Sequence, residues 1–354
     1  GGYTATPSIM VPQAWHSAGK SKVMTDTRFD VLGIGNAIVD VLSRTDDAFL
    51  EAHGLDKGAM RLIDAEQAER LYALMGPGME MSGGSAANTL HGIASLGGRA
   101  AFIGKVRNDT LGNIFRHDMK AAGVSFETAA ASDGPPTARC LILVTPDAQR
   151  TMNTYLGACV DLTPDDVDTD LVAASAYTYL EGYLWDPPQA KAAFLKAANA
   201  AHAAGRKVAL SLSDAFCVER HRREFRALVE KHVDVLFANE VEIKALFEVA
   251  SFDDAMQAIR GKVEVAALTR SEKGAVIVTA NEVHVLDAEP VAAVVDTTGA
   301  GDLYASGFLH GLTRGLPVAV CGSLGALAAA EVISHFGARP ERSLAGLVAD
   351  KVHG

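Results

Sequence analysis

Cysteine is scarce in this sequence, and the few cysteines follow no recognisable spacing. Four of the 354 residues are cysteines, and they form no C-x-x-C pair and no pattern with histidines. They are Cys140, Cys159, Cys217 and Cys321. The chain therefore lacks the signatures of a zinc site and of a disulfide framework. This usage suits a reducing compartment, so the cytoplasm is the expected location.

Long apolar runs and a targeting segment are also missing. The most apolar late segment, residues 318–333, is mostly alanine and glycine and contains Glu331, which predicts a packed helix and not a membrane span. The beginning of the chain has no periodicity and no signal-peptide core. We expect residues 1–28 to form a poorly ordered N-terminal extension, and no membrane as a partner.

The sequence has fewer basic than acidic residues. The chain has 32 Lys and Arg against 43 Asp and Glu, a formal net charge of -11, and no Lys/Arg-rich tract stands out. A nucleic-acid partner needs a basic face for its phosphates. The composition therefore argues against nucleic-acid binding and favours a small-molecule partner.

A third glycine is missing from the first glycine-containing turn. Residues 29–35 read as a buried strand that ends in Gly33-x-Gly35, but Ile38 stands where a dinucleotide-binding fingerprint needs its last glycine. The chain then continues extended and does not open a helix. A nicotinamide-dependent dehydrogenase is therefore the remotest of the alternatives.

What is present from residue 176 onward is a regular alternation of strands and helices. Such alternation predicts a mostly parallel sheet covered by helices on both faces. We expect one α/β domain over residues 29–342 and a C-terminal helix or tail over 343–354. The expected strands are 177–181, 208–212, 233–237, 263–268 and the hairpin 276–278 with 283–286, and the expected helices are 189–204, 219–231, 300–313 and 318–335.

The alternation of strands and helices is interrupted by two segments, residues 37–65 and 123–158. Both are rich in strand-forming residues and carry proline and glycine. Two such excursions could pair into a small sheet over the edge of the main domain. A lid of this kind would exclude water from a reactive site.

The strongest chemical motif is Asp296-Thr-Thr-Gly-Ala-Gly-Asp302, which precedes a helix of small residues. A small-residue loop at a helix start leaves backbone N–H groups free, and these can hold a phosphoryl group. The donors are expected around Gly299, Ala300 and Gly301. Asp302 at the same helix start could accept the proton of an attacking hydroxyl.

A second motif, Gly83-Gly-Ser-Ala-Ala-Asn88, opens another small-residue helix. Gly83 and Gly84 would let a ligand approach the backbone, and Ser85 and Asn88 carry polar groups suited to sugar hydroxyls. Together the two motifs resemble the signatures of the ribokinase-like (PfkB) carbohydrate kinases, from about Phe29 to about Arg342. The resemblance implies a three-layer α/β/α domain with a mostly parallel central sheet and a small β-sheet lid, and use of ATP and Mg²⁺.

Further motifs agree with this resemblance. Asn239-Glu-Val-Glu242 resembles the family's N-x-x-E motif, which implies that Glu242 organises Mg²⁺ through its waters while Asn239 lies near the phosphates. The segment Thr269-Arg-Ser-Glu-Lys-Gly274 resembles the nucleotide-binding loop, with Ser271 in place of the usual glycine.

Within the family, the chain is most similar to the adenosine kinase branch. In the run from Gly33 to Asp40, the resemblance implies that Asn36 and Asp40 face the ribose. It places Arg150 near the phosphates, where a guanidinium suits the charge. Apolar lid contacts are implied for Ile38, Cys140 and Met152.

Two aromatic residues bear on the acceptor. Tyr183 and Phe216 stand at positions that resemble those flanking the purine, and aromatic faces bind a flat base better than a bare sugar. The resemblance also places Thr298 with the nucleotide and pairs Asp296 with a monovalent cation, which leaves K⁺ activation open. Thr298 departs from the asparagine that some adenosine kinases carry at that position.

These observations predict an ATP-dependent phosphotransferase acting on an alcohol, with the 5′-hydroxyl of a nucleoside, adenosine first, as acceptor. A kinase of a free sugar such as ribose or fructose is the nearest alternative. A non-catalytic nucleoside-binding regulator is more remote, because such a protein has no need of Asp302 as a base. The chain could be a monomer or a homodimer.

Overall fold

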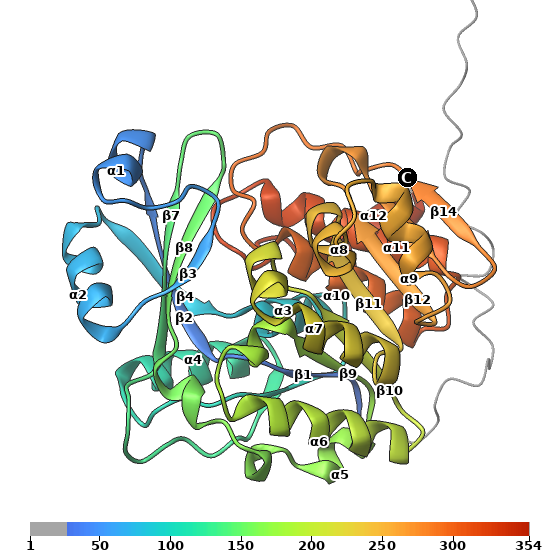
Figure 1. Cartoon of the computed structure of the whole chain (residues 1–354), viewed down its shortest axis with the longest axis horizontal. Coiled ribbons are helices and arrows are strands. Elements are labelled where there is room, and N and C mark those ends of the chain that lie inside the picture. The colour runs from blue at the N-terminus through green and yellow to red at the C-terminus, as the bar shows by residue number, and fades with distance from the viewer. Residues whose placement is uncertain (1–26, 354) are drawn as a thin grey trace, which may run out of the picture.

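The computed structural model describes residues 27–353, so all but the last two residues of the expected N-terminal extension lie outside the described part of the chain. Two sheets organise these residues (Figure 1). Within residues 27–353 no helix combines the length and apolarity that crossing a membrane requires.

The main sheet has nine strands in the described chain, in the order β14-β13-β12-β11-β10-β9-β1-β5-β6. Pairing is parallel from β6 to β12, and the last two strands add antiparallel at one edge. The strands are β1 (Phe29–Ile34), β5 (Ala100–Ile103), β6 (Val124–Phe126), β9 (Ser175–Glu181), β10 (Lys207–Ser211), β11 (Val235–Asn239), β12 (Val265–Thr269), β13 (Ala275–Val278) and β14 (Val283–Leu286). The predicted parallel sheet is thus confirmed.

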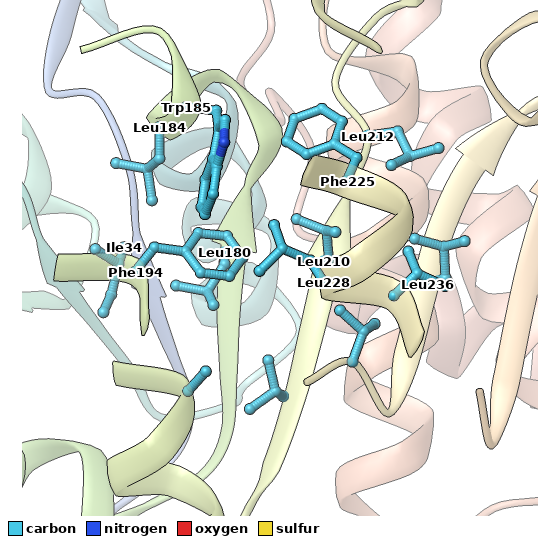
Figure 2. Close-up of a cluster of buried hydrophobic side chains, with 14 of the residues drawn as sticks. Ile34, Leu180, Leu184, Trp185, Phe194, Leu210, Leu212, Phe225, Leu228 and Leu236 are labelled. Atoms are coloured by element: carbon cyan, nitrogen blue, oxygen red, sulfur yellow. The ribbon is translucent and has the colours of Figure 1, made fainter. Parts of the chain in front are cut away.

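One face of the main sheet packs against helices from the middle of the chain. These are α5 (Thr169–Ala173), α6 (Ala190–Ala203), α7 (Ala215–Lys231), α8 (Glu240–Phe247) and α9 (Phe252–Ile259). Figure 2 shows strand residues such as Leu180 and Leu210 between Phe194 of α6 and Phe225 of α7. Trp185 packs edge-on against Phe194, with ring centroids 4.9 Å apart. This apolar layer anchors the strand ends that carry polar residues.

The opposite face holds the two helices opened by the glycine motifs, α3 (Ser85–Ser95) and α10 (Ala300–Thr313). With them lie α4 (Thr110–Ala121), α11 (Val318–Ile333) and α12 (Leu344–His353). Glycines let these helices approach closely: a Cβ on Gly307 would lie 2.2 Å from the Leu324 carbonyl oxygen, and one on Gly92 would lie 2.1 Å from Ser306 Oγ. Small residues therefore bring the starts of α3 and α10 together.

The second sheet has the order β3-β8-β7-β2-β4 and lies at the left of Figure 1. Its strands are β2 (Ile38–Arg44), β3 (Met60–Leu62), β4 (Gly78–Gly83), β7 (Ala138–Val144) and β8 (Arg150–Tyr155). Helices α1 (Asp47–Ala52) and α2 (Ala65–Leu74) cover its outer face through an apolar cluster that includes Val41 and Leu141. The inner face carries Ile38, Cys140 and Ile142.

The expected lid boundaries, residues 37–65 and 123–158, need correction at two places. β6 pairs with β5 and belongs to the main sheet, although it falls in the second expected segment. β4 pairs with β2 and belongs to the second sheet, although it falls outside both segments. The sequence Gly-Met-Glu-Met-Ser-Gly of β4 has no β-branched residue, so its strand propensity is low and pairing with β2 decides its conformation.

Short 3₁₀ turns complete the described chain, namely η2 (Gly157–Asp161), η3 (Pro164–Asp166), η4 (Gly182–Trp185) and η5 (Ser271–Lys273). Two of them follow parallel strands at their carboxyl ends. In open parallel sheets this edge is where ligands bind, at the point where successive strands lead to opposite sides. Here β1 is that point, because β5 lies on one side of it and β9 on the other.

Candidate active site

A cavity lies where the carboxyl ends of β1 and β9 meet the inner face of the second sheet, and together with the solvent at its mouth it encloses about 640 Å³ of empty space. Thirteen predicted site residues line it: Asn36, Ile38, Asp40, Gly84, Ser85, Asn88, Cys140, Arg150, Met152, Tyr183, Thr298, Gly299 and Asp302. Positions more than 250 residues apart in the chain thus contribute to one cavity.

Eight further lining residues were not predicted: Met60, Leu62, Ile142, Thr154, Leu156, Glu181, Asp186 and Ser213. The unpredicted lining residues of the second sheet could have been found from the alternation of side chains along its strands. Because side chains alternate along a strand, the two-residue spacing of Cys140 and Ile142, and of Met152 and Thr154, puts each pair on one face.

Asp302 lies at the first turn of α10, against the start of α3. Its Oδ1 accepts a hydrogen bond from Ser85 Oγ at 2.6 Å and its Oδ2 one from Asn88 Nδ2 at 3.0 Å. Burial raises the pKa of this carboxyl, and the two donors oppose that rise. A carboxylate has about four acceptor positions, so it can take a further proton from a ligand hydroxyl while both bonds persist.

The loop that precedes α10 is held by Asp296, which is fully buried. Its Oδ1 accepts from the N–H and the hydroxyl of Thr298, at 2.9 and 2.6 Å, and its Oδ2 accepts from the Gly337 N–H at 2.8 Å. Gly299 then takes a left-handed conformation, φ 81°, as the N-cap of the helix. These bonds fix the direction in which the next amides point.

The free amides differ slightly from the expected set. The Ala300 N–H closes a turn onto the Thr297 carbonyl at 3.2 Å, whereas the N–H groups of Gly299, Gly301 and Asp302 make no hydrogen bond within the described chain. A Cβ on Gly301 would meet nothing within 4 Å. An anion could therefore approach three amides at the positive end of α10, and the free amides are those of Gly299, Gly301 and Asp302.

The second sheet touches this loop directly. The Ala148 carbonyl, in the turn between β7 and β8, accepts from Thr297 Oγ1 at 3.0 Å and from its N–H at 3.4 Å. Ala148 adopts φ 65°, an uncommon conformation for a residue with a side chain. The turn thus places β8, and with it Arg150, over the start of α10.

Asp40 and Gly83 are neighbours across the β2–β4 pair. A Cβ at Gly83 would lie 2.1 Å from the Asp40 carboxylate, so only glycine leaves room for it. Asp40 is 5% exposed, and burial raises its pKa to about 7. Gly83 does not line the cavity itself but supports a residue that does.

Glu181, at the end of β9, connects the first strand with α3. Its two carboxylate oxygens accept from the Asn36 N–H at 2.6 Å and the Ala86 N–H at 2.7 Å. Burial raises its pKa to about 8. The Asn36 amide group donates to the Tyr183 carbonyl at 3.3 Å, and its side-chain oxygen has no partner in the described chain, which leaves an acceptor at the cavity.

Of the two aromatics expected beside a base, the structure brings only Tyr183 to the cavity. Its hydroxyl donates to Asp214 Oδ2 at 2.7 Å. The expected place of Phe216 has to be corrected, because Phe216 is 46% exposed and lies outside the cavity. Asp214 caps α7 through the Cys217 N–H, and Cys217 and Val218 take the buried positions of the first turn, so Phe216 falls on the solvent side.

Of the predicted nucleotide residues, Thr298 lines the cavity, whereas the others lie at or just after the ends of β11 and β12, outside it. Asn239 and Glu242 form a reciprocal capping box at the start of α8, with bonds of 2.8 and 2.9 Å. Burial raises the pKa of Glu242 to about 7, and Arg150 and Asp302 both influence it, which places it in the same electrostatic environment as the cavity.

The neighbouring loop has two residues in left-handed conformations. Ser271 has φ 51° and Gly274 has φ 90°. A Cβ on Gly274 would lie 1.9 Å from the Leu286 carbonyl oxygen, so glycine is required there. Ser271, which stands where a glycine was expected, keeps the glycine-like conformation. Thr269 ends β12 and is half-buried.

The whole arrangement can bind a small polyhydroxylated molecule beside a carboxylate and an anion site. Residues 75–343 match the pfkB family of carbohydrate kinases, which is more than half of the chain. The chain belongs to the pfkB carbohydrate kinase family. Its ribokinase-like α/β fold and its activity class, a phosphotransferase with an alcohol group as acceptor, follow from this membership. Kinases of this family use ATP and typically Mg²⁺.

Relatives include proteins described as adenosine and as sugar kinases. The crystal structure of adenosine kinase from Sinorhizobium meliloti is 54% identical and superimposes with a TM-score of 0.90, covering 92% of this chain and 99% of that one. A probable sugar kinase from Rhizobium etli CFN 42 is 52% identical, with the same TM-score and coverage of 92% and 98%. Yeast adenosine kinase is 27% identical over 305 residues, 80% of this chain and 88% of that protein.

Proposed function

We propose that this pfkB kinase transfers the γ-phosphoryl group of ATP to the 5′-hydroxyl of adenosine. The single observation that carries the proposal is the shared cavity, in which Asp40 of the second sheet and Asp302 at the start of α10 both line one space. A nucleoside needs both functions, one to hold its vicinal ribose hydroxyls and one to deprotonate the 5′-hydroxyl. The likeness to adenosine kinases supports the choice of acceptor.

Asp302 accepts the proton of the 5′-hydroxyl as that oxygen attacks phosphorus. Hydrogen bonds from Ser85 and Asn88 hold the carboxylate in place without using all of its acceptor positions. The transferred group carries negative charge on its oxygens, and the free amides of Gly299, Gly301 and Asp302 point from the positive end of α10. Positioning and electrostatics supply most of the acceleration in such transfers.

Arg150 adds positive charge from the second sheet. It lines the cavity, donates to Met152 Sδ at 3.0 Å, and has a raised pKa because of nearby acidic groups that include Asp302. The inner apolar face with Ile38, Cys140 and Met152 excludes water that would otherwise accept the phosphoryl group.

Glu242 is the residue suited to hold Mg²⁺ through the ion's water shell. Only one of its oxygens has a hydrogen-bond partner, the Asn239 N–H, and the described residues contain no cluster of three His, Cys, Asp or Glu that could enclose a metal. One carboxylate with retained waters fits the preference of Mg²⁺. When bound, the ion neutralises phosphate charge. Thr269, Ser271 and Gly274 are proposed to contact the nucleotide, and a monovalent cation at Asp296 stays a prediction.

A free-sugar kinase is the second candidate, because only one of the two expected aromatics reaches the cavity. The deciding experiment supplies ATP and Mg²⁺ with adenosine, guanosine, inosine, cytidine, ribose or fructose, and measures ADP release and product mass. Adenosine should give a nucleoside monophosphate at a kcat/KM far above that of the sugars. Phosphorylation of ribose or fructose alone would overturn the nucleoside assignment and keep Asp302 as base, whereas nucleoside binding without turnover would favour a regulator.

A further inference from the structure

Arg339 lies beside the proposed ribose-binding carboxylate but outside the cavity. It follows α11, and its guanidinium reaches between α3 and β4. Its Nη1 contacts His91 Nδ1, and its Nη2 donates to the Gly83 carbonyl at 3.4 Å. Its buried Nε has no hydrogen-bond partner in the described chain. This guanidinium is thus enclosed with no carboxylate bonded to it.

Gly83 separates this cation from Asp40. The Asp40 carboxylate lies against the Gly83 α-carbon, because a Cβ there would be 2.1 Å from it, and Arg339 contacts the carbonyl of the same glycine. The β2–β4 register keeps these groups together by pairing Ile38 with Gly83 and Asp40 with Met81. Gly83 is therefore in contact with the buried carboxyl group of Asp40 at its α-carbon and with the Arg339 guanidinium at its carbonyl oxygen.

His91 does not neutralise this cation. Burial and the adjacent guanidinium keep the pKa of His91 well below its usual value, so the ring is neutral. Its Nδ1 contacts both the Arg339 guanidinium and the Ala87 carbonyl, the latter at 3.0 Å. Among the charges near Arg339 are Asp40, Asp118 and Asp302, and Asp40 has the largest effect on it. Asp118 accepts from the Ser82 N–H at 2.9 Å, and Asp302 is bonded to Ser85 and Asn88.

We propose that Arg339 is a positioning residue that favours the ionised form of Asp40, and thereby sets the affinity for the vicinal hydroxyls of the nucleoside. The proposal rests on the proposed function, in which Asp40 holds the ribose. An ionised carboxylate accepts from both hydroxyls, whereas a protonated one donates its proton to one of them or to the protein. A cation held on the far side of Gly83 supplies the charge without occupying the ligand's space.

The charged groups around Asp40 come from several elements. Two cations, Arg339 after α11 and Arg150 of β8, oppose two carboxylates, Asp302 of α10 and Asp296 of the preceding loop. The Cys140 thiol of β7 also faces Asp40, but its pKa, raised to about 12, keeps it neutral. Removing Arg339 leaves the carboxylates in excess and raises the pKa of Asp40 above about 7.

The test compares adenosine with 2′,3′-dideoxyadenosine, which lacks both hydroxyls, by isothermal titration calorimetry without ATP from pH 6 to 9. Arg339→Met should weaken adenosine binding about fivefold at pH 7 if the pKa of Asp40 rises by one unit from about 7, and about tenfold for each further unit. It should also move the midpoint of the pH dependence upward. Dideoxyadenosine binding should not change. Arg339→Lys, which keeps the charge, should recover most of the loss.

The matched control is Arg342→Met, which removes the same charge from the exposed surface of the same segment. It should leave both affinities and the pH midpoint unchanged. In an Asp40→Asn background, Arg339→Met should have no further effect on adenosine binding. Thermal unfolding of each variant identifies those that fold. If Arg339→Met does not fold, the proposal is tested by Arg339→Lys and by Arg339→Met in the Asp40→Asn background.

The measurements separate the role of Asp40 from the role of Arg339. A wild-type protein that binds adenosine no better than dideoxyadenosine overturns the ribose-holding role of Asp40, and the role of Arg339 with it. A wild-type preference for adenosine that survives Arg339→Met with the same pH midpoint overturns the role of Arg339 alone. An equal loss for both ligands shows a structural role and also overturns it.

Discussion

Ser85 and Asp302 are 217 positions apart in the chain and are joined by a 2.6 Å hydrogen bond from the serine hydroxyl to Oδ1. The bond connects the first turns of α3 and α10, the helices that the two glycine motifs open. A carboxylate that is both buried and anchored in this way keeps one orientation toward the cavity. The proposed chemistry depends on that orientation.

Asp302→Asn should keep the fold and lose turnover. The amide oxygen can still accept from Ser85. The side-chain oxygen of Asn88 has no partner among residues 27–353, so this side chain can rotate to accept from the new NH₂ group. Loss of a general base should lower kcat by about 10²–10⁴-fold. Steady-state kinetics and adenosine calorimetry measure the two effects. Near-normal turnover would show that another group takes the proton.

Ser85→Ala should shift the pH profile of kcat/KM. The Ser85 hydroxyl lowers the pKa of Asp302, so its removal raises that pKa further. The acidic limb of kcat/KM, which reports the free enzyme, should move to higher pH, and activity at low pH should fall more than activity at pH 9. An unchanged limb would separate Ser85 from the titration of Asp302.

Tyr183→Ala and Phe216→Ala form a matched pair of aromatic truncations. Tyr183 lines the cavity and Phe216 is exposed outside it. We expect Tyr183→Ala to raise KM for adenosine by about two- to tenfold, because the lost aromatic contact is worth about 0.5–1.5 kcal/mol. Phe216→Ala should leave KM unchanged. Equal effects of the two truncations on KM would mean that the adenine ring binds away from Tyr183.

Gly301→Ala and Gly307→Ala separate activity from packing on one helix. A Cβ on Gly301 meets nothing within 4 Å, whereas one on Gly307 would lie 2.2 Å from a carbonyl of α11. Gly307→Ala should therefore destabilise the protein by about 1–3 kcal/mol in urea unfolding. Gly301→Ala should be stable and should raise KM for ATP, since its methyl group enters the proposed phosphoryl space. A stable Gly301→Ala variant with unaltered kinetics would place the phosphate elsewhere.

Stability of the ligand-free protein should fall as pH rises from about 5 to 8. Burial raises the pKa of Asp40 and Glu242 to about 7 and of Glu181 to about 8. In that window the native state holds protons that the unfolded state has released, so each such proton costs about 1.4 kcal/mol per pH unit as pH rises. Urea unfolding at several pH values measures the slope, and Glu181→Gln should flatten it. A flat profile between pH 5 and 8 would mean that these carboxyls are ionised when buried.

Local patterns predicted most strands and helices of the main domain because each element carries its own periodicity. The helix predicted over 189–204 is Ala190–Ala203, and the hairpin predicted from 276–278 and 283–286 is formed by β13 and β14. β4 was not predicted, because its residues have low strand propensity. β6 was assigned to the wrong sheet, because the sequence of a three-residue strand does not indicate which strand it pairs with.

By itself the sequence determined the two glycine motifs, Asp302 at a helix start and the parallel α/β class, since these depend on residues close together in the chain. Only the tertiary structure decided which distant side chains meet. It turned Phe216 to solvent through the Asp214 cap, and it set Arg339 against the glycine that supports Asp40. Such contacts depend on how helices and sheets pack, and that packing joins residues without any common local pattern.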